Sequence, residues 1–289
     1  TVVTLETINF VTLDLTLNAN MFNSASFNID IDLSIFELLG DVPLVMSDDN
    51  GSFYVPSFGI DELGDFDNEG YYCYISGFED LNISIDGEPI DQTTPLILEP
   101  FKANMLPYLP QYEMSSDEVF SQYYDDILFI SNDMGQFIVP EYGVFQITTM
   151  YPGEAYSVVL SGNQNLEFSY PAFGSSTRMD VVHDNSLYEQ SHSEYYNIPN
   201  TGVSHPILIT SIFGNVVAGD EIIAYANDKV VGATKILDPN NPILISASKG
   251  FKSYDIDLQG YIDGDEIKLK LLKHHNGKEI NINSHLDND

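Results

Sequence analysis

The stretch Gly51-Ser52-Phe53-Tyr54-Val55-Pro56-Ser57-Phe58-Gly59 returns later in the chain as Gly135-Gln136-Phe137-Ile138-Val139-Pro140-Glu141-Tyr142-Gly143. The Gly, Phe, Val, Pro and Gly positions match in both stretches. Further pairs keep the same offset: Ala19-Asn20-Met21 with Ala103-Asn104-Met105, Phe36 with Phe120, Leu44 with Leu128 and Ser47 with Ser131. Such matches at one constant offset predict a small module that is present twice.

Each copy carries the same order of local signals. A strand comes first and a short helix follows, which in the second copy has capping-box spacing at Ser115 and Glu118. The turn Asp48-Asp49-Asn50-Gly51 then predicts a hairpin, because Asn and Gly tolerate positive φ. Pro56 and Pro140 end the returning strand, and a Tyr-rich strand and a last strand close each copy.

Composition restricts the class of function. The 289 residues include 10 Lys+Arg against 44 Asp+Glu, a formal net charge of -34. This charge repels phosphate backbones and anionic headgroups, which argues against nucleic acid and membrane surfaces as partners. A content of 43% hydrophobic and 12% aromatic residues indicates a folded chain rather than a disordered one. Acidity of this degree fits saline water, where counterions screen the repulsion. The single cysteine, Cys73, excludes a disulfide framework and a cysteine zinc site.

The predicted fold class is mainly β with minor α: two tandem small α+β repeat modules followed by a β-sandwich-like domain. The expected boundaries are an N-terminal strand region at 1–17, repeat modules at 18–98 and 99–171, a connector at 172–205 and the C-terminal domain at 206–289. No apolar run is long enough to span a membrane, so membrane insertion is not expected.

The repeats resemble modules common in secreted proteins of Bacteroidetes and in structural proteins of marine phages, which open with a Gly-Trp-Asn-Met strand. The residues that carry the resemblance are Asn20-Met21, Asn104-Met105, the hairpins Gly51 to Gly59 and Gly135 to Gly143, and Pro152-Gly153-Glu154-Ala155-Tyr156. The C-terminal part is similar to a companion module with a Gly-Asp-Glu-Ile pattern, here Gly219-Asp220-Glu221-Ile222. The strand-opening Trp of the family is missing from both copies. The resemblance implies non-catalytic surface or particle-building roles.

One local pattern has the spacing of a twelve-residue calcium loop. Its candidate metal ligands are Asp255, Asp257, Gln259, Tyr261, Asp263 and Glu266. Gln259 departs from the loop pattern, and the alternation after Glu266 predicts a strand where an EF-hand needs a helix. The alternative interpretation is a connection between two strands. Beyond calcium at this loop no cofactor is expected.

No catalytic motif is visible: the chain lacks a His-Glu-x-x-His pattern, a Gly-x-Ser-x-Gly elbow, a P-loop and a dinucleotide fingerprint. His274-His275 lies at a predicted hairpin turn, where exposure is the default. Tyrosines such as Tyr72, Tyr195 and Tyr196 fit either strand packing or an interface.

The expected function is that of a non-enzymatic structural or attachment protein at an extracellular or particle surface. A virion component of a marine phage (capsid decoration, fibre or tail-associated protein) is favoured over a secreted bacterial adhesin, because bacterial relatives embed such modules in longer chains. The alternative is a carbohydrate-binding module, with or without calcium. The expected partners are other structural proteins of the same assembly, surface glycans and further copies of the chain.

Overall fold

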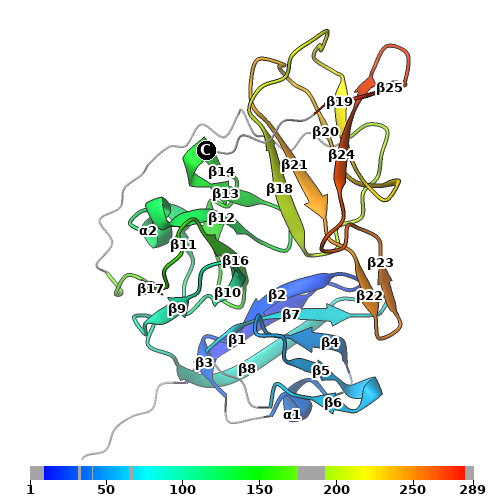
Figure 1. Cartoon of the computed structure of the whole chain (residues 1–289). Helices are drawn as coiled ribbons and strands as arrows, with labels where there is room; N and C mark the ends of the chain where they lie inside the picture. Colours follow the sequence, from blue (N-terminus) through cyan, green and yellow to red (C-terminus); the bar gives the residue numbers. More distant parts are fainter. Residues whose placement is uncertain (1–9, 32–33, 41, 65–67, 175–192, 284–289) are drawn as a thin grey trace, which may run out of the picture. The chain divides into compact units, whose positions relative to one another are not determined.

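The structure is a computed structural model that describes residues 10–31, 34–40, 42–64, 68–174 and 193–283 (Figure 1). The chain divides into two compact units. The first contains the described residues within 1–132, 139–142 and 147–181, and the second those within 133–138, 143–146 and 182–289. Strands dominate both units, which confirms the mainly β class. The strand predicted before residue 10 and much of the predicted connector fall outside the described residues.

The residues of the first predicted copy build an antiparallel five-stranded sheet. Its strands lie in the order β2 (Phe22–Ser26), β7 (Gly70–Ile75), β4 (Pro43–Ser47), β5 (Phe53–Val55) and β6 (Ile60–Asp61). The single-turn helix α1 (Ile35–Leu39) precedes β4, and the 3-10 turn η1 (Pro56–Phe58) follows β5. Gly59 ends η1 at φ 67°, a left-handed conformation that favours glycine.

The residues of the second predicted copy build a sheet with the same strand order. It runs β10 (Ala103–Pro107), β16 (Ala155–Leu160), β12 (Ile127–Ser131), β13 (Phe137–Val139) and β14 (Val144–Phe145). The accompanying helical segments are α2 (Ser116–Phe120), η2 (Tyr124–Asp126) and η3 (Pro140–Tyr142).

An irregularity of strand pairing occurs at the same place in both sheets. The register of β4 on β7 shifts between Pro43 and Val45, and that of β12 on β16 shifts between Ile127 and Phe129. A bulge inserts an extra residue and increases the local twist. Both central strand pairs therefore bend at equivalent positions.

Further strands accompany each five-stranded sheet. They are β1 (Val11–Leu17), β8 (Leu81–Pro89) and β3 (Ile29–Asp30) in the first case, and β9 (Leu96–Leu98) with β17 (Leu166–Phe168) and β11 (Met114–Ser115) with β15 (Thr149–Met150) in the second. Leu17 pairs with Leu81, and Leu98 pairs with Leu166. Strand β1, which the predicted boundaries place before the first module, therefore has a counterpart in β9.

The opening strands match in a register that differs from the predicted one. The Asn104 side chain donates to the carbonyls of Glu99, Lys102 and Val158 at 2.9, 3.4 and 3.1 Å, and accepts from Glu99 N at 2.7 Å. In the first sheet the residue that makes this set of bonds is Asn23, whereas the sequence comparison paired Asn104 with Asn20.

The short helices also match in this shifted register. Glu118 N donates to Ser115 Oγ at 3.2 Å, and Ser115 N donates to Glu118 Oε2 at 3.1 Å, which completes the predicted capping box. In α1 the amide of Glu37 donates to Ser34 Oγ at 3.3 Å. Ser34 is thus the counterpart of Ser115, which pairs Phe120 with Leu39 rather than with Phe36. The chain between the short helix and the hairpin differs in length between the two sheets. An offset that aligns the hairpins therefore misaligns the helices.

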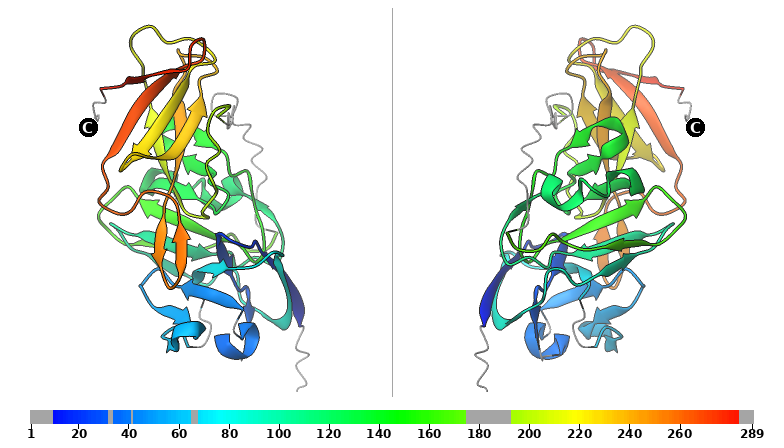
Figure 2. Two further views of the ribbon diagram at one scale, coloured as in Figure 1. Left: turned by 90° about the vertical axis from the view of Figure 1, so that its right-hand side faces the viewer. Right: turned by 90° about the vertical axis from the view of Figure 1, so that its left-hand side faces the viewer.

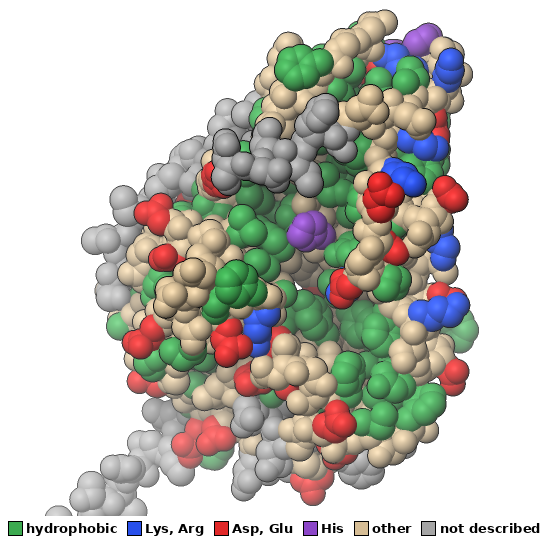
Figure 3. Space-filling model, in the orientation of Figure 1, with side chains coloured by type: hydrophobic (Ala, Val, Ile, Leu, Met, Phe, Trp, Pro, Cys, Tyr) green, Lys and Arg blue, Asp and Glu red, His purple; other side chains and the backbone are tan. Residues whose placement is uncertain are grey.

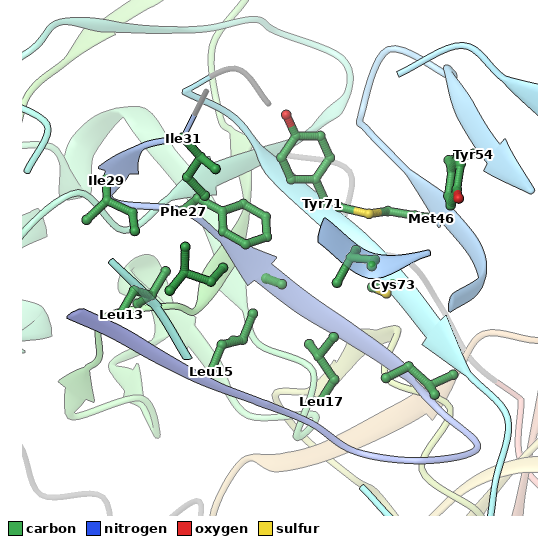
Figure 4. Packing of buried hydrophobic residues seen from close by; sticks show 14 residues of the cluster. Leu13, Leu15, Leu17, Phe27, Ile29, Ile31, Met46, Tyr54, Tyr71 and Cys73 are labelled. Carbon is green, nitrogen blue, oxygen red and sulfur yellow. The ribbon is translucent and has the colours of Figure 1, made fainter. Parts of the chain in front are cut away.

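The core of the first sheet forms against β1. Leu13, Leu15 and Leu17 are buried and alternate with exposed residues along this strand, as one buried face requires (Figure 4). Phe27 and Tyr71 belong to the same cluster. Cys73 is buried within it as a free thiol, as expected for its position in a strand.

Besides β14 and most of β13, the second unit contains one four-stranded sheet and two strand pairs. They are β20 (Lys229–Lys235), β19 (Glu221–Ala226), β24 (Ile267–Lys273) and β25 (Lys278–Asn281) in the sheet, β18 (Ser204–Ile209) with β21 (Ile243–Ser248), and β22 (Phe251–Ser253) with β23 (Ile256–Leu258). The yellow-to-red strands of the sheet run side by side in Figure 2.

One hydrophobic core of this unit draws on both the four-stranded sheet and the β18–β21 pair. Ile222 and Ala224 of β19 share it with Ile245 of β21. β20 and β21 approach each other closely at Gly232, where an added Cβ would lie 2.8 Å from Ile245 Cγ2 and 2.8 Å from the Ser246 carbonyl oxygen. Glycine is needed here because no side chain fits.

Candidate functional site

The first half of the predicted calcium loop lies on the β22–β23 hairpin. Asp255 stands in its turn at φ 62°. Asp257 lies in β23, and its Oδ2 is 3.5 Å from Lys252 Nζ. Gln259 accepts from Lys229 Nζ at 2.8 Å and donates to Asp257 Oδ1 at 3.2 Å. Asp257 therefore pairs with a lysine, and the neutral side chain of Gln259 accepts from another.

The second half of the loop leads into β24. Tyr261 is engaged through its backbone, with its N donating to Ser248 O at 3.0 Å. Asp263 Oδ2 accepts from Lys249 Nζ at 2.8 Å, and Glu266 Oε2 lies 3.5 Å from Lys268 Nζ. The flanking elements are strands, as the sequence predicted. No three acidic side chains of this loop converge on a common point in the part of the chain that the structure describes. Calcium binding here stays a prediction.

The two five-stranded sheets join where β2 meets the residues before β16. Ala25 and Glu154 form an antiparallel bridge, and Ser26 N donates to Gly153 O at 2.9 Å. The Ser26 hydroxyl donates to Glu154 O at 2.6 Å and accepts from Tyr108 N at 3.0 Å. We call the junction of residues 25–28 with 105–110 and 153–155 the seam. These backbone bonds fix the two sheets in a single register.

Close packing accompanies the seam bonds. A Cβ added at Gly70 would lie 2.8 Å from Ala155 Cβ and 2.9 Å from Met105 O. Asn28 is fully buried, and its Nδ2 donates to Pro110 O at 2.9 Å. The seam therefore leaves no room for a larger residue at Gly70.

A single cation lies beside the seam. Lys102 is the only Lys or Arg among residues 1–177. Its Nζ lies 3.1 Å from Asp49 Oδ1, 3.3 Å from Glu99 Oε2 and 3.0 Å from Asn50 Oδ1. Burial lowers the pKa of the Lys102 ammonium, but Asp49 and Glu99 outweigh burial and raise it. Asp49 Oδ2 also accepts from Met105 N at 2.7 Å, so the turn of the first hairpin is held against β10.

A small cavity of about 280 Å³ opens at this point. Polar side chains line it, among them Asn50, Asn68, Glu69 and Lys102. Its volume lies near the lower end of the range for small-ligand sites, about 300–1,000 Å³. Amide, carboxylate and ammonium groups in one concavity offer both donors and acceptors to a polar ligand.

Phe101, next to Lys102, holds an unusual conformation. Its φ is 64° and its side chain is 85% exposed. The counterpart in the first sheet is Asn20 at φ 65°, whose amide donates to Gly77 O at 2.8 Å. Asparagine tolerates this left-handed conformation, whereas a bulky residue is strained by about 1–3 kcal/mol. The second sheet thus carries an exposed aromatic ring at a strained position where the first carries a hydrogen-bonding amide.

A buried carboxylate organises the second unit. Asp220 has a fully buried side chain and accepts from Lys273 Nζ, from Val217 N at 3.1 Å and from His274 N at 3.1 Å. Burial alone would raise the pKa of Asp220, but the bonds from Lys273 and His274 outweigh it and hold the pKa at about 2. The sequence patterns singled out Gly219-Asp220 and His274-His275 separately. The two pairs come together only because β19 pairs with β24, which sets Glu221 opposite Leu272.

The segment Ser193–Tyr196 crosses the same sheet as a strap. The Ser193 hydroxyl donates to Glu221, and Glu194 N donates to Glu221 Oε1 at 2.7 Å. The Glu194 carboxylate pairs with Lys235 on β20. Successive residues of the strap therefore bond to neighbouring strands.

Tyrosines complete the attachment of the strap. Tyr196 OH and Tyr225 OH donate to Glu279 Oε1 at 2.5 and 2.7 Å. Lys270 Nζ donates to Glu279 Oε2 at 2.9 Å and lies 4.2 Å from the centre of the Tyr225 ring. These bonds lower the pKa of Glu279 to about 2, the largest contribution coming from Tyr196. Tyr196 therefore packs within the unit, while Tyr195 is half exposed and donates to His274 O at 3.3 Å.

The carboxylates are spread over the visible face rather than gathered in one place (Figure 3). No helix among the described residues is long and apolar enough to cross a membrane. No family model, no curated protein and no solved structure matches the chain.

Proposed function

We propose that the chain is a non-enzymatic structural or attachment protein of an extracellular or particle surface. The seam carries this proposal: two similar sheets are joined by hydrogen bonds from the Ser26 amide to Gly153 and from the Ser26 hydroxyl to Glu154. Such a junction joins the two sheets through hydrogen bonds, and the chain has a formal net charge of -34, a combination that suits assembly and display. A virion component of a marine phage is the first candidate, and a secreted bacterial surface adhesin is the second.

We also propose that the two five-stranded sheets are duplicated modules of the resembled family, and that the C-terminal part of the chain is β-sandwich-like. The equal strand orders, the bulges at Val45 and Phe129 and the bonds of Asn23 and Asn104 support the duplication. The core shared between β19 and β21 supports the sandwich.

Localisation in the source organism tests the structural role. Antibodies raised against the purified chain are applied to intact cells and to phage particles of that source, and bound antibody is counted by immunogold microscopy. Labelling of particles supports the virion component, and labelling of the cell exterior supports the adhesin. Labelling confined to permeabilised cells contradicts both.

Glycan binding is the second candidate function, and the cavity beside Lys102 favours it. Phe101, the exposed residue before Lys102 in the chain, offers a ring for stacking, and the amide and carboxylate groups of the cavity offer the hydrogen bonds that sugars require. A glycan array at marine ionic strength, with and without calcium, tests it. Phe101→Ala should abolish binding, while Phe78→Ala, which removes another fully exposed ring, should not. Equal binding by both variants contradicts this site.

A further inference from the structure

Three side chains that can each ligate a metal meet at one end of the four-stranded sheet. Asp220 comes from the turn before β19, and His274 and His275 come from the turn between β24 and β25. One potential ligand atom of each lies within 4.8 Å of the other two. Among the described residues, this is the one group of three or more His, Cys, Asp or Glu side chains whose potential ligand atoms lie this close together.

The carboxylate of the group is already oriented. Asp220 Oδ2 accepts from Lys273 Nζ and from Val217 N at 3.1 Å, while Oδ1 faces His274, lying 3.1 Å from its Nδ1. Carboxylates that bind metals in proteins are commonly held through their other oxygen in this manner. Because the Asp220 side chain is fully buried, Oδ1 is fixed in position.

The two imidazoles are free to adapt. His275 is exposed, and the side chain of His274 is 45% exposed, so small rotations can bring both rings onto a common centre. Their ring centroids are 5.9 Å apart. A metal bound through His274 Nδ1 would take the place of that ring's contact with Asp220 Oδ1, leaving the Lys273 and Val217 bonds intact.

We propose that Asp220, His274 and His275 form a site for a divalent transition metal, with zinc as the expected ion. Two imidazole nitrogens and one carboxylate oxygen suit Zn²⁺, with water in the fourth position of a tetrahedron. Imidazole ligands disfavour Ca²⁺ and Mg²⁺, which prefer oxygen. The ammonium of Lys273 repels a cation, so binding should be weaker than at structural zinc sites with thiolate ligands. The bound ion would tie the β24–β25 turn to the start of β19.

This site is independent of the proposed surface role and of the 255–266 loop. Its test uses the full chain, purified with chelator and dialysed, and titrated with ZnCl2 by calorimetry and with CoCl2 by visible absorption. We expect one saturable zinc site and intense tetrahedral cobalt bands. His274→Ala and His275→Ala should each weaken zinc binding by at least about tenfold, the loss typical of a damaged metal site.

His205→Ala is the matched control, because His205 is an exposed histidine on β18. It should bind zinc as the wild type does, and calcium should not compete in any of the proteins. Near-ultraviolet circular dichroism verifies that each variant is folded, and Co²⁺ should shift or broaden the imidazole NMR signals of His274 and His275 in the wild type. Absence of saturable zinc binding, or equal binding by His275→Ala and wild type, overturns the proposal.

Discussion

Asn23 and Asn104 occupy the same position in two different sheets and make the same set of hydrogen bonds. Each side-chain amide donates to the carbonyls of residues five and two positions earlier and to a carbonyl of the neighbouring strand, β7 or β16. Each side-chain oxygen accepts from the amide five residues earlier. Both side chains are almost fully buried, so each closes the turn that leads into its sheet.

Replacing either asparagine should destabilise the first unit by a similar amount. Asn23→Ala and Asn104→Ala each leave several buried main-chain groups without a partner, which should cost about 3 kcal/mol. Denaturant unfolding measures the loss, and Asn163→Ala, at an exposed turn, should have little effect. A large loss for one asparagine and none for the other would show that the two positions are not equivalent.

Gly70 tests the packing of the seam. Gly70→Ala places a methyl group within 2.8 Å of Ala155 Cβ, an overlap that should cost about 1–3 kcal/mol. Gly162→Ala is the control, because nothing lies within 4 Å of its added Cβ. Thermal unfolding should separate the two variants. If Gly70→Ala melts as the wild type does, the two sheets do not approach each other as closely as the seam requires.

The net charge of -34 should make stability depend on salt. Counterions screen the repulsion between carboxylates, so the melting temperature should rise as NaCl is added, and KCl should have the same effect at equal ionic strength. Differential scanning calorimetry measures the shift. A melting temperature that does not change with either salt would remove the argument for adaptation to saline water.

Calcium at constant ionic strength tests the 255–266 loop. An ion bound only by the folded state stabilises it, so calcium should raise the melting temperature if the loop is a site. Asp257→Asn with Glu266→Gln should then abolish the calcium-specific increase. Glu88→Gln with Glu167→Gln, two exposed acids elsewhere, makes the same change of charge and should retain it. If both double variants respond equally to calcium, the loop is only a connection between strands, and its acids Asp257 and Asp263 pair with Lys252 and Lys249.

Acid should weaken the attachment of the strap. The pKa of Glu279 is lowered from 4.5 to about 2, so its stabilising effect is complete above about pH 4.5 and is lost as the pH falls toward 2. Glu279→Gln should therefore lower the melting temperature at pH 7, and the difference from wild type should shrink between pH 4.5 and 2. Glu141→Gln, at an exposed position, should follow the wild type throughout. A difference that stays constant down to pH 2 would contradict the assigned pKa.

Local chemistry made the hairpins and the second helix predictable. The hairpin turn needs positive φ at Gly51, and the Ser115 and Glu118 spacing caps a helix wherever the rest of the chain lies. The predicted register of the opening strand was wrong. The identical triplets at Asn20 and Asn104 lie at the same offset as the hairpins and were therefore paired. The hydrogen bonds that Asn104 makes in the second sheet are made by Asn23 in the first.

The candidate sites depended on contacts that no local pattern encodes. The seam combines main-chain bonds, such as that from Ser26 N to Gly153 O, with the Ser26 hydroxyl, and a single serine in a strand gives no signal of such a contact. Asp220 and His274 meet only after β19 pairs with β24. Lys102 carried a signal that could have been used: it is the only cation in a long acidic stretch, and such a residue is expected to lie among carboxylates.

The hydrogen bond between Ser26 and Glu154 also determines when the two sheets can join during synthesis. The two residues are 128 positions apart. At about 5–20 residues per second, the partner of β2 leaves the ribosome roughly 6 to 25 s after β2 itself. The first sheet can pair its own strands in that interval, but its Gly70 face stays open to solvent until Ala155 arrives. The nascent chain thus passes through a period in which the first sheet has formed and the second has not. Electrostatic repulsion between acidic side chains disfavours association of one such intermediate with another during this period.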